Sequence, residues 1–91
     1  MNKRLHVFIS GNVQGVGLRY FLRNKAMRMG INGFVRNLQD GRVEAVFEGN
    51  DEGLQKVIEF CKRGTFISKV KNLDVKEESF RNEFREFEIR E

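Results

Sequence analysis

The chain has 91 residues and a net charge of +4, which predicts one domain, residues 1–91, with a surface that either is simply basic or attracts anions. Its charges are mixed along the chain, which favours small anions over nucleic acid, and no apolar run is long enough for a membrane span or a secretory signal. One cysteine and one histidine exclude an internal disulfide, leave no cluster of zinc or iron ligands, and suit a cytoplasmic protein.

A strand and a helix are predicted first, with a glycine-rich loop between them. Residues Leu5–Ser10 alternate between an apolar and a mixed face, with the period of two that a strand requires. Apolar residues then recur at three- and four-residue spacing over Leu18–Met29, which predicts an amphipathic helix. Gly30 is expected to end this helix in the left-handed conformation.

A hairpin and a second helix are expected next. Residues 31–38 and 42–48 read as two strands, and Asp40-Gly41 between them is typical of a hairpin turn. Residue 49 is a glycine that ends the second of these strands. Asn50 or Asp51 can then cap a helix, because both side chains accept hydrogen bonds from backbone N–H groups of the first turn.

Two more strands are expected in the remaining third of the chain. Residues Ile67–Val75 alternate, but the pattern breaks between Val70 and Leu73, where a bulge or a change of register is expected. EESFRNE (77–83) reads as a polar turn, and Phe84–Arg90 reads as a last strand.

This order of elements predicts an α+β fold, the ferredoxin-like α/β sandwich. Each strand has one apolar face, so two helices are expected together on one face of a largely antiparallel sheet. Right-handed crossovers turn the order β-α-β-β-α-β into this sandwich, and the additional C-terminal strand is expected at an edge. The fold hosts many functions and therefore assigns none by itself.

The loop before the first helix carries the clearest functional signal. In GNVQGVGLR (11–19), three glycines allow positive φ and a close approach of the backbone to a ligand. The helix N-terminus offers unpaired N–H groups, and Arg19 adds a planar fork that matches phosphate. The alternative is that the glycines only form a tight turn. A nucleotide site is not expected, because Gly17 is not followed by Lys-Ser/Thr and Tyr20 occupies the third glycine position of a dinucleotide fingerprint.

Two blocks of the sequence resemble the signature blocks of the acylphosphatase family. They are GNVQGVGLR and GFVRNLQDGRVEAVFEG (33–49), and the similarity extends over nearly the whole chain. The resemblance implies an acylphosphatase, a hydrolase that cleaves the carboxyl–phosphate bond of small acyl phosphates without a metal or cofactor. Because the carboxylate leaving group has a conjugate acid with a pKa of about 4 to 5, no general acid is needed.

The resemblance also implies which residues would act. Arg19 would supply the essential cation, and Asn37 would orient the attacking water. The amides implied to bind the phosphoryl oxygens belong to Gln14, Gly15, Val16, Gly17, Leu18 and Arg19. The sequence departs from the family where many members have Phe in place of Leu18 and two prolines in place of Thr65-Phe66. The first departure bears on helix packing and the second on loop geometry.

The expected partners follow from this chemistry, and two other functions stay open. A cytoplasmic monomer would bind a small acyl phosphate, with inorganic phosphate or sulfate as a product-like ligand, and would bind neither nucleic acid nor a membrane. The first alternative is a non-catalytic module, or one that handles carbamoyl phosphate, as in the N-terminal part of larger maturation proteins. A free-standing enzyme is preferred because no linker or zinc-type cysteines follow. The second is an RNA-binding domain of the same element order, disfavoured because two acids and no aromatic lie on the mixed face of the third strand.

Three further residues are expected to have structural roles. His6 would lie half-covered or at the surface on the mixed face of its strand. Cys61, on the apolar stripe of the second helix, would be a buried and inert thiol. Arg36 would point to the face opposite Asn37 and carry a solvated charge.

Overall fold

The computed structural model describes residues 1–91 and has five strands and two helices. Their bounds in chain order are β1 Asn2–Asn12, α1 Leu18–Arg28, β2 Asn32–Asn37, β3 Val43–Asn50, α2 Asp51–Arg63, β4 Lys69–Glu78 and β5 Phe87–Arg90. The predicted order of elements is confirmed. Neither helix has the length and the apolar composition that a bilayer-spanning helix needs.

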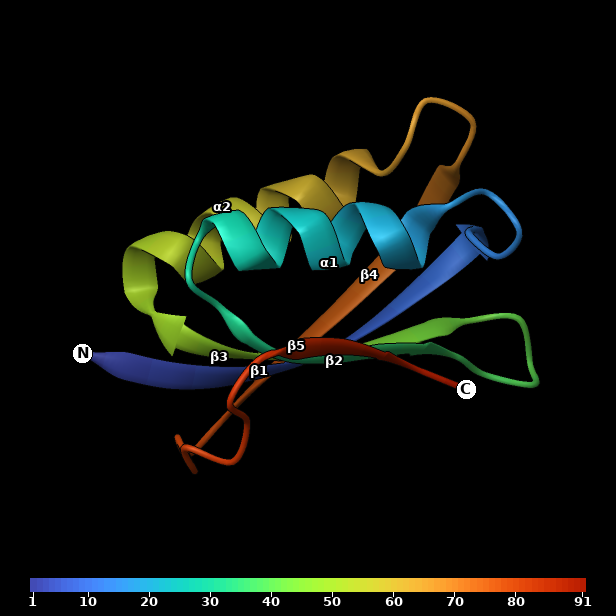
Figure 1. Ribbon diagram of the computed structural model, residues 1–91. Coiled ribbons are helices and arrows are strands. Elements are labelled where there is room, and N and C mark those ends of the chain that lie inside the picture. The colour runs from blue at the N-terminus through green and yellow to red at the C-terminus, as the bar shows by residue number, and fades with distance from the viewer.

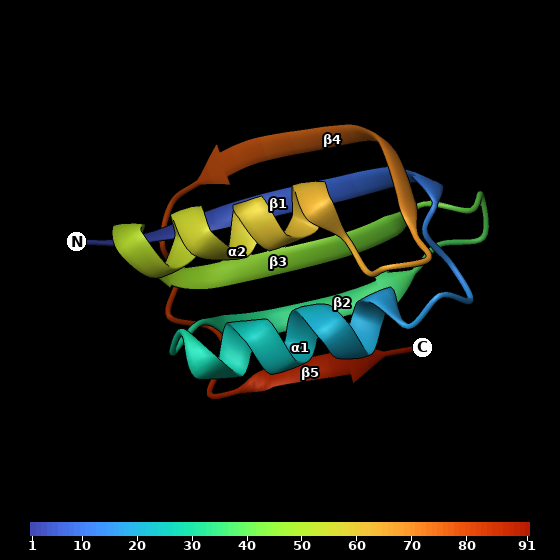
Figure 2. The ribbon, with the colours of Figure 1, turned by 90° about the horizontal axis from the view of Figure 1, so that it is seen from above.

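The strands form one sheet in the order β4-β1-β3-β2-β5. Neighbouring strands run antiparallel, except that β5 pairs in parallel with β2. Both helices lie side by side on one face of this sheet (Figures 1 and 2). The protein therefore has the predicted ferredoxin-like sandwich, with β5 as an edge strand.

The main core lies between the helices and the sheet. It contains 15 buried side chains, which come from β1, β2, β3, β5, both helices and the adjoining loops. Val7 and Ile9 of β1 face this core, as their alternation predicted, and Cys61 of α2 is fully buried within it. Burial raises the pKa of the Cys61 thiol to about 12, so the predicted inert thiol fits its surroundings.

A β-bulge explains the irregular pattern of β4. Ser10 of β1 pairs with Asn72, but the next residue, Gly11, pairs with Val70, so Lys71 is one extra residue on β4. The bulge lies between Val70 and Leu73, where the alternation of the sequence breaks. It lets the residues on both sides of it keep their apolar side chains toward the helices.

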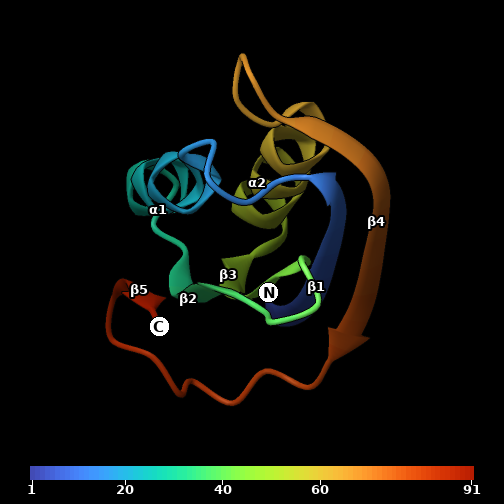
Figure 3. The ribbon, with the colours of Figure 1, turned by 90° about the vertical axis from the view of Figure 1, so that its right-hand side faces the viewer.

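The segment between β4 and β5 differs from its prediction. It crosses the face of the sheet opposite the helices and joins the two edges (Figure 3). Phe84 packs on that face against Phe34 and Val46. The last strand begins at Phe87 and not at Phe84. Phe84 belongs instead to the crossing segment, where its side chain is buried in this second cluster.

Buried Glu48 of β3 anchors the crossing segment. Its carboxylate accepts hydrogen bonds from the N–H groups of Arg81 (2.9 Å) and Glu83 (3.0 Å), and it lies 3.3 Å from Nη1 of Arg4. Burial alone would raise the pKa of Glu48, but the two N–H donors and Arg4 outweigh burial and lower it from its ordinary value of 4.5.

Candidate active site

The β1–α1 loop, residues 13–17, turns the chain sharply into the first helix. Gly15 and Gly17 have φ values of 73° and 76°, in the left-handed region that favours glycine. Gly17 is the N-cap of α1 and makes no side-chain capping bond, and the first turn holds no acidic residue. The positive end of the helix is therefore not neutralised by a capping side chain or a nearby carboxylate.

The six amides implied by the family resemblance are all unpaired within the protein. None of the N–H groups of the stretch 14–19 donates to a backbone or side-chain acceptor; the first helical bond runs from Phe21 N–H to the Gly17 carbonyl. Helix N-termini leave such donors without partners, and here the loop adds more of them at the same end. A row of main-chain donors at the positive end of a helix dipole can hold an anion.

Gln14 ties the loop to the β2–β3 turn. Its side-chain Nε2 donates to the carbonyls of Leu38 (2.7 Å) and Arg42 (3.0 Å). These two carbonyls flank the turn that follows β2, so the loop is held beside the end of that strand. The family resemblance implicated only the backbone amide of Gln14, and this side-chain contact was not predicted from the sequence.

Asn37 is the last residue of β2 and lies on the helix-bearing face of the sheet. Its partner in the neighbouring strand is buried Val43, and buried Val35, two residues earlier in β2, shares the same face. Arg36 lies on the other face. Helix α1 packs over β2, and the end of β2 and the first turn of α1 lie toward the same end of the molecule (Figure 2). The Oδ1 atom of Asn37 is buried and has no hydrogen-bond partner, which is rare for a buried acceptor and calls for a ligand or water.

Arg19 is the second residue of α1 and is half-buried. Its guanidinium forms neither an ion pair nor a hydrogen bond within the protein. One turn later, Arg23 lies over the ring of Tyr20 at 5.3 Å, and its buried Nε atom also has no partner. The first two turns of α1 thus carry two unpaired cations, of which sequence reasoning singled out only Arg19.

The side chains of Leu18 and Val16 attach the loop to the main core. Leu18 is buried in the core, and Val16 is half-buried against it, so their contribution to a ligand would come from the backbone alone. The hydroxyl of Thr65, after α2, donates to the Val16 carbonyl at 3.1 Å. The departure from the family pattern at Thr65 therefore contacts the loop itself.

The polar residues of the opposite face bond to one another. His6 Nε2 lies 2.6 Å from the Glu44 carboxylate, and Nδ1 lies 3.3 Å from Glu78. The same Glu44 carboxylate accepts a hydrogen bond from Arg36 Nε, so Arg36, whose side chain is 43% exposed, is partly solvated as predicted and also has an ion-pair partner that was not predicted. The expected half-covered His6 is confirmed. No group of three or more His, Cys, Asp or Glu side chains is arranged to hold a metal ion.

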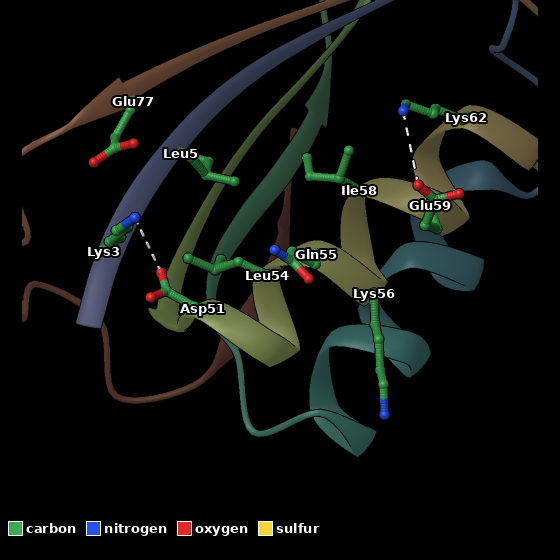
Figure 4. A pocket seen from close by; sticks show the side chains of 10 residues that line it. All are labelled: Lys3, Leu5, Asp51, Leu54, Gln55, Lys56, Ile58, Glu59, Lys62 and Glu77. Atoms are coloured by element: carbon green, nitrogen blue, oxygen red, sulfur yellow. Dashed lines mark ion pairs between the residues drawn. The ribbon is translucent and has the colours of Figure 1, made fainter. Parts of the chain in front are cut away.

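The largest surface groove lies elsewhere, between α2 and β1 (Figure 4). It has a volume of about 620 Å³ and contains none of the predicted site residues. Its lysines are matched by carboxylates, as in the pairs Lys3–Asp51 (3.3 Å) and Lys62–Glu59 (3.7 Å). The charges of this groove are therefore balanced, whereas the first turns of α1 carry an excess of positive charge.

The protein is therefore a ferredoxin-like α/β sandwich with a row of unpaired main-chain donors at the N-terminus of α1. The sequence profile of the family described as Acylphosphatase matches residues 5–89. An acylphosphatase of Syntrophobacter fumaroxidans is 49% identical over 87 residues, which cover 96% of this chain and 90% of that protein. The chain belongs to the acylphosphatase family, and the enzyme class predicted from the sequence is confirmed.

Solved structures agree with this assignment. The acylphosphatase from Bacillus subtilis superposes with a TM-score of 0.94 at 36% identity, covering 100% of both chains. The HypF protein of T. kodakarensis also contains a similar part. That part aligns with a TM-score of 0.84 at 29% identity, covering 98% of this chain and 12% of HypF.

Proposed function

We propose that the protein hydrolyses small acyl phosphates to a carboxylate and inorganic phosphate without a metal or cofactor. The observation that carries this proposal is the row of six unpaired N–H groups, from Gln14 to Arg19, at the N-terminus of α1. These donors would hold the phosphoryl oxygens, and the unpaired guanidinium of Arg19 would add a bidentate contact. Inorganic phosphate or sulfate would bind in the same place as a product-like ligand.

The substrate class suits a site without an acid–base pair. An acyl phosphate releases a carboxylate, which departs without receiving a proton because its conjugate acid has a pKa of about 4 to 5. Catalysis then depends on two factors, which are stabilisation of charge on the phosphoryl oxygens and placement of water in line with the leaving oxygen. The loop amides and Arg19 would provide the first factor.

Asn37 would provide the second factor. Its unpartnered Oδ1 can accept a hydrogen bond from the attacking water, and it lies on the same face of the sheet as α1. A carboxamide has no useful basicity, so the proton of this water would pass to the substrate phosphoryl oxygen. An Asn37→Asp variant tests this step, because recovery of rate with a basic limb in its pH profile would assign the proton to the side chain instead.

The opposite face of the sheet offers little for RNA. The segment that crosses it, together with Phe84, covers part of the face that RNA-recognition domains use for base stacking. Several of the charges there are engaged in ion pairs, such as Arg4–Glu78 (2.9 Å). We therefore propose a small acyl phosphate, and not a nucleic acid, as the partner of a cytoplasmic monomer.

Phosphate release from benzoyl phosphate, measured with and without a chelator, tests the proposal. Turnover that the chelator does not change is the expected result. Loss of turnover on chelation would contradict metal independence, and no turnover at all would contradict hydrolysis.

The alternative is an acylphosphatase-like module that handles carbamoyl phosphate, and the similarity to a part of T. kodakarensis HypF shows that this fold also occurs within a larger protein. A preference for carbamoyl phosphate over benzoyl phosphate in the same assay would support it.

A further inference from the structure

Thr65 is the only residue outside the β1–α1 loop whose side chain hydrogen-bonds to the main chain of that loop. Its Oγ1 donates to the Val16 carbonyl at 3.1 Å, across 49 positions of sequence. Thr65 directly follows Gly64, the C-cap of α2, so the contact joins the loop to the end of the second helix. The loop and the segment after α2 lie at the same end of the molecule (Figure 1).

This contact determines where the next amide points. In a trans peptide unit the C=O and N–H bonds point in opposite directions. With the Val16 carbonyl directed at Thr65, the N–H of Gly17 points away from Thr65, and it has no acceptor in the protein. A hydrogen bond to the carbonyl also polarises the same peptide unit, which makes its N–H a stronger donor.

The Val16–Gly17 peptide needs such a support, because one of the two dihedral angles that set its orientation is the φ angle of Gly17. A Cβ added at Gly15 or Gly17 would meet no atom within 4 Å, so packing does not hold the backbone there. Glycine also has little steric resistance to rotation of the peptide. A hydrogen bond from outside the loop can therefore select one orientation of this peptide.

The hydroxyl of Thr65 is itself oriented by its neighbours. It accepts a hydrogen bond from Ser68 N–H at 3.2 Å, which leaves its own hydrogen for the Val16 carbonyl. Ser68 Oγ also accepts from Thr65 N–H at 2.7 Å and lies 3.1 Å from the Thr65 carbonyl. The bond from the Ser68 N–H, which does not involve the Ser68 side chain, thus directs the hydroxyl hydrogen of Thr65 to the Val16 carbonyl.

We propose that Thr65 is a positioning residue that holds the Val16–Gly17 peptide so that the Gly17 N–H faces the phosphoryl group. The inference rests on the proposed function, because it assumes that this amide binds the substrate. Thr65 acts through Gly17 and does not itself touch the substrate.

A pair of variants tests the hydroxyl. Thr65→Val keeps the branched shape without the donor, whereas Thr65→Ser keeps the donor. We expect Thr65→Val to raise both the Kd for inorganic phosphate and the KM for benzoyl phosphate about fivefold, the effect of one hydrogen bond, with a smaller change in kcat. The Gly17 amide resonance should also shift in phosphate-free Thr65→Val, and Thr65→Ser should restore both readouts to within about twofold of the unsubstituted protein.

Ser68→Ala is the matched control, because it removes hydrogen bonds within the turn but leaves the Thr65 hydroxyl in place. The inference is overturned if Thr65→Val binds phosphate like the unsubstituted protein, or if Ser68→Ala loses as much binding as Thr65→Val. It is also overturned if Thr65→Ser shows no recovery while its urea unfolding midpoint is unchanged. Absence of phosphate binding and hydrolysis in the unsubstituted protein would instead remove the proposed function.

Discussion

Replacing Arg19 by alanine is expected to remove activity without loss of stability. The guanidinium has no hydrogen bond or ion pair within the protein, so its removal leaves no buried partner behind. Arg19 lies in the first turn of α1, where a positive charge opposes the helix dipole. Its loss should therefore change the free energy of unfolding by about zero to +1 kcal/mol, in the stabilising direction.

The expected loss of activity follows from the contacts that Arg19 would make to the substrate. A hydrogen bond to a charged group contributes about 1.5–3 kcal/mol, and a planar fork can make two of them. Two bonds at the lower figure give about 3 kcal/mol, which corresponds to a fall in kcat/KM of about 150-fold. Arg19→Lys should also be poor, because a point charge replaces the fork.

Hydrolysis of benzoyl phosphate and urea unfolding of the same preparations provide the two measurements. Arg28→Ala is a matched control, because Arg28 is an exposed, unpaired arginine in the last turn of the same helix. At that end a cation is favourable, so Arg28→Ala should lose about 0.3–1 kcal/mol of stability and keep full activity.

Two results would refute this reasoning. Near-normal turnover of Arg19→Ala or Arg19→Lys would show that the anion site lies elsewhere. A loss of more than about 1 kcal/mol of stability in Arg19→Ala would show that Arg19 supports the fold through contacts and is not reserved for a ligand.

Three other changes have distinct expected outcomes. Asn37→Ala should lower kcat about 10²-fold and leave phosphate binding nearly unchanged, because the water and not the phosphoryl group is misplaced; an equal loss of phosphate binding would contradict this role. Glu48→Gln should lose about 2–3 kcal/mol at pH 7, because one backbone N–H loses its acceptor. Since the folded pKa of Glu48 is below 4.5, the stability that its carboxylate contributes is present above that pH and is lost as pH falls through the folded pKa. The difference in unfolding free energy between Glu48→Gln and the unsubstituted protein, measured in urea, should therefore shrink in acid. A pH-independent difference would refute this linkage. Cys61 should react with a thiol reagent only as fast as the protein unfolds, and rapid labelling in neutral buffer without urea would contradict its burial.

Local pattern was enough for most of the fold. The alternation of Leu5–Ser10, the helical spacing of Leu18–Met29 and the turn at Asp40-Gly41 each depend on interactions between residues close in sequence, and each element is present. The bulge near Lys71 was also visible as a break in period. Such signals survive folding because the core face of each element is decided by its own periodicity.

The candidate site could be predicted only in part. The unpaired amides and the facing of Asn37 follow from the glycine loop and from strand alternation, both of which are local. The contacts that support the loop are not local: the Gln14 side chain reaches a turn 24 or more residues away, and Thr65 reaches Val16 across 49. No period or motif in one sequence indicates which distant carbonyl a side chain will meet.

The sequence by itself determined the order of elements, the buried stripes and the location of the glycine-rich loop before α1, because these depend on near neighbours along the chain. Tertiary structure alone decided that the segment before β5 crosses the sheet, that Phe84 packs with Phe34, and that Glu44 pairs with both His6 and Arg36. These outcomes depend on which strands become neighbours. The order β4-β1-β3-β2-β5 brings together side chains that no spacing along the chain relates.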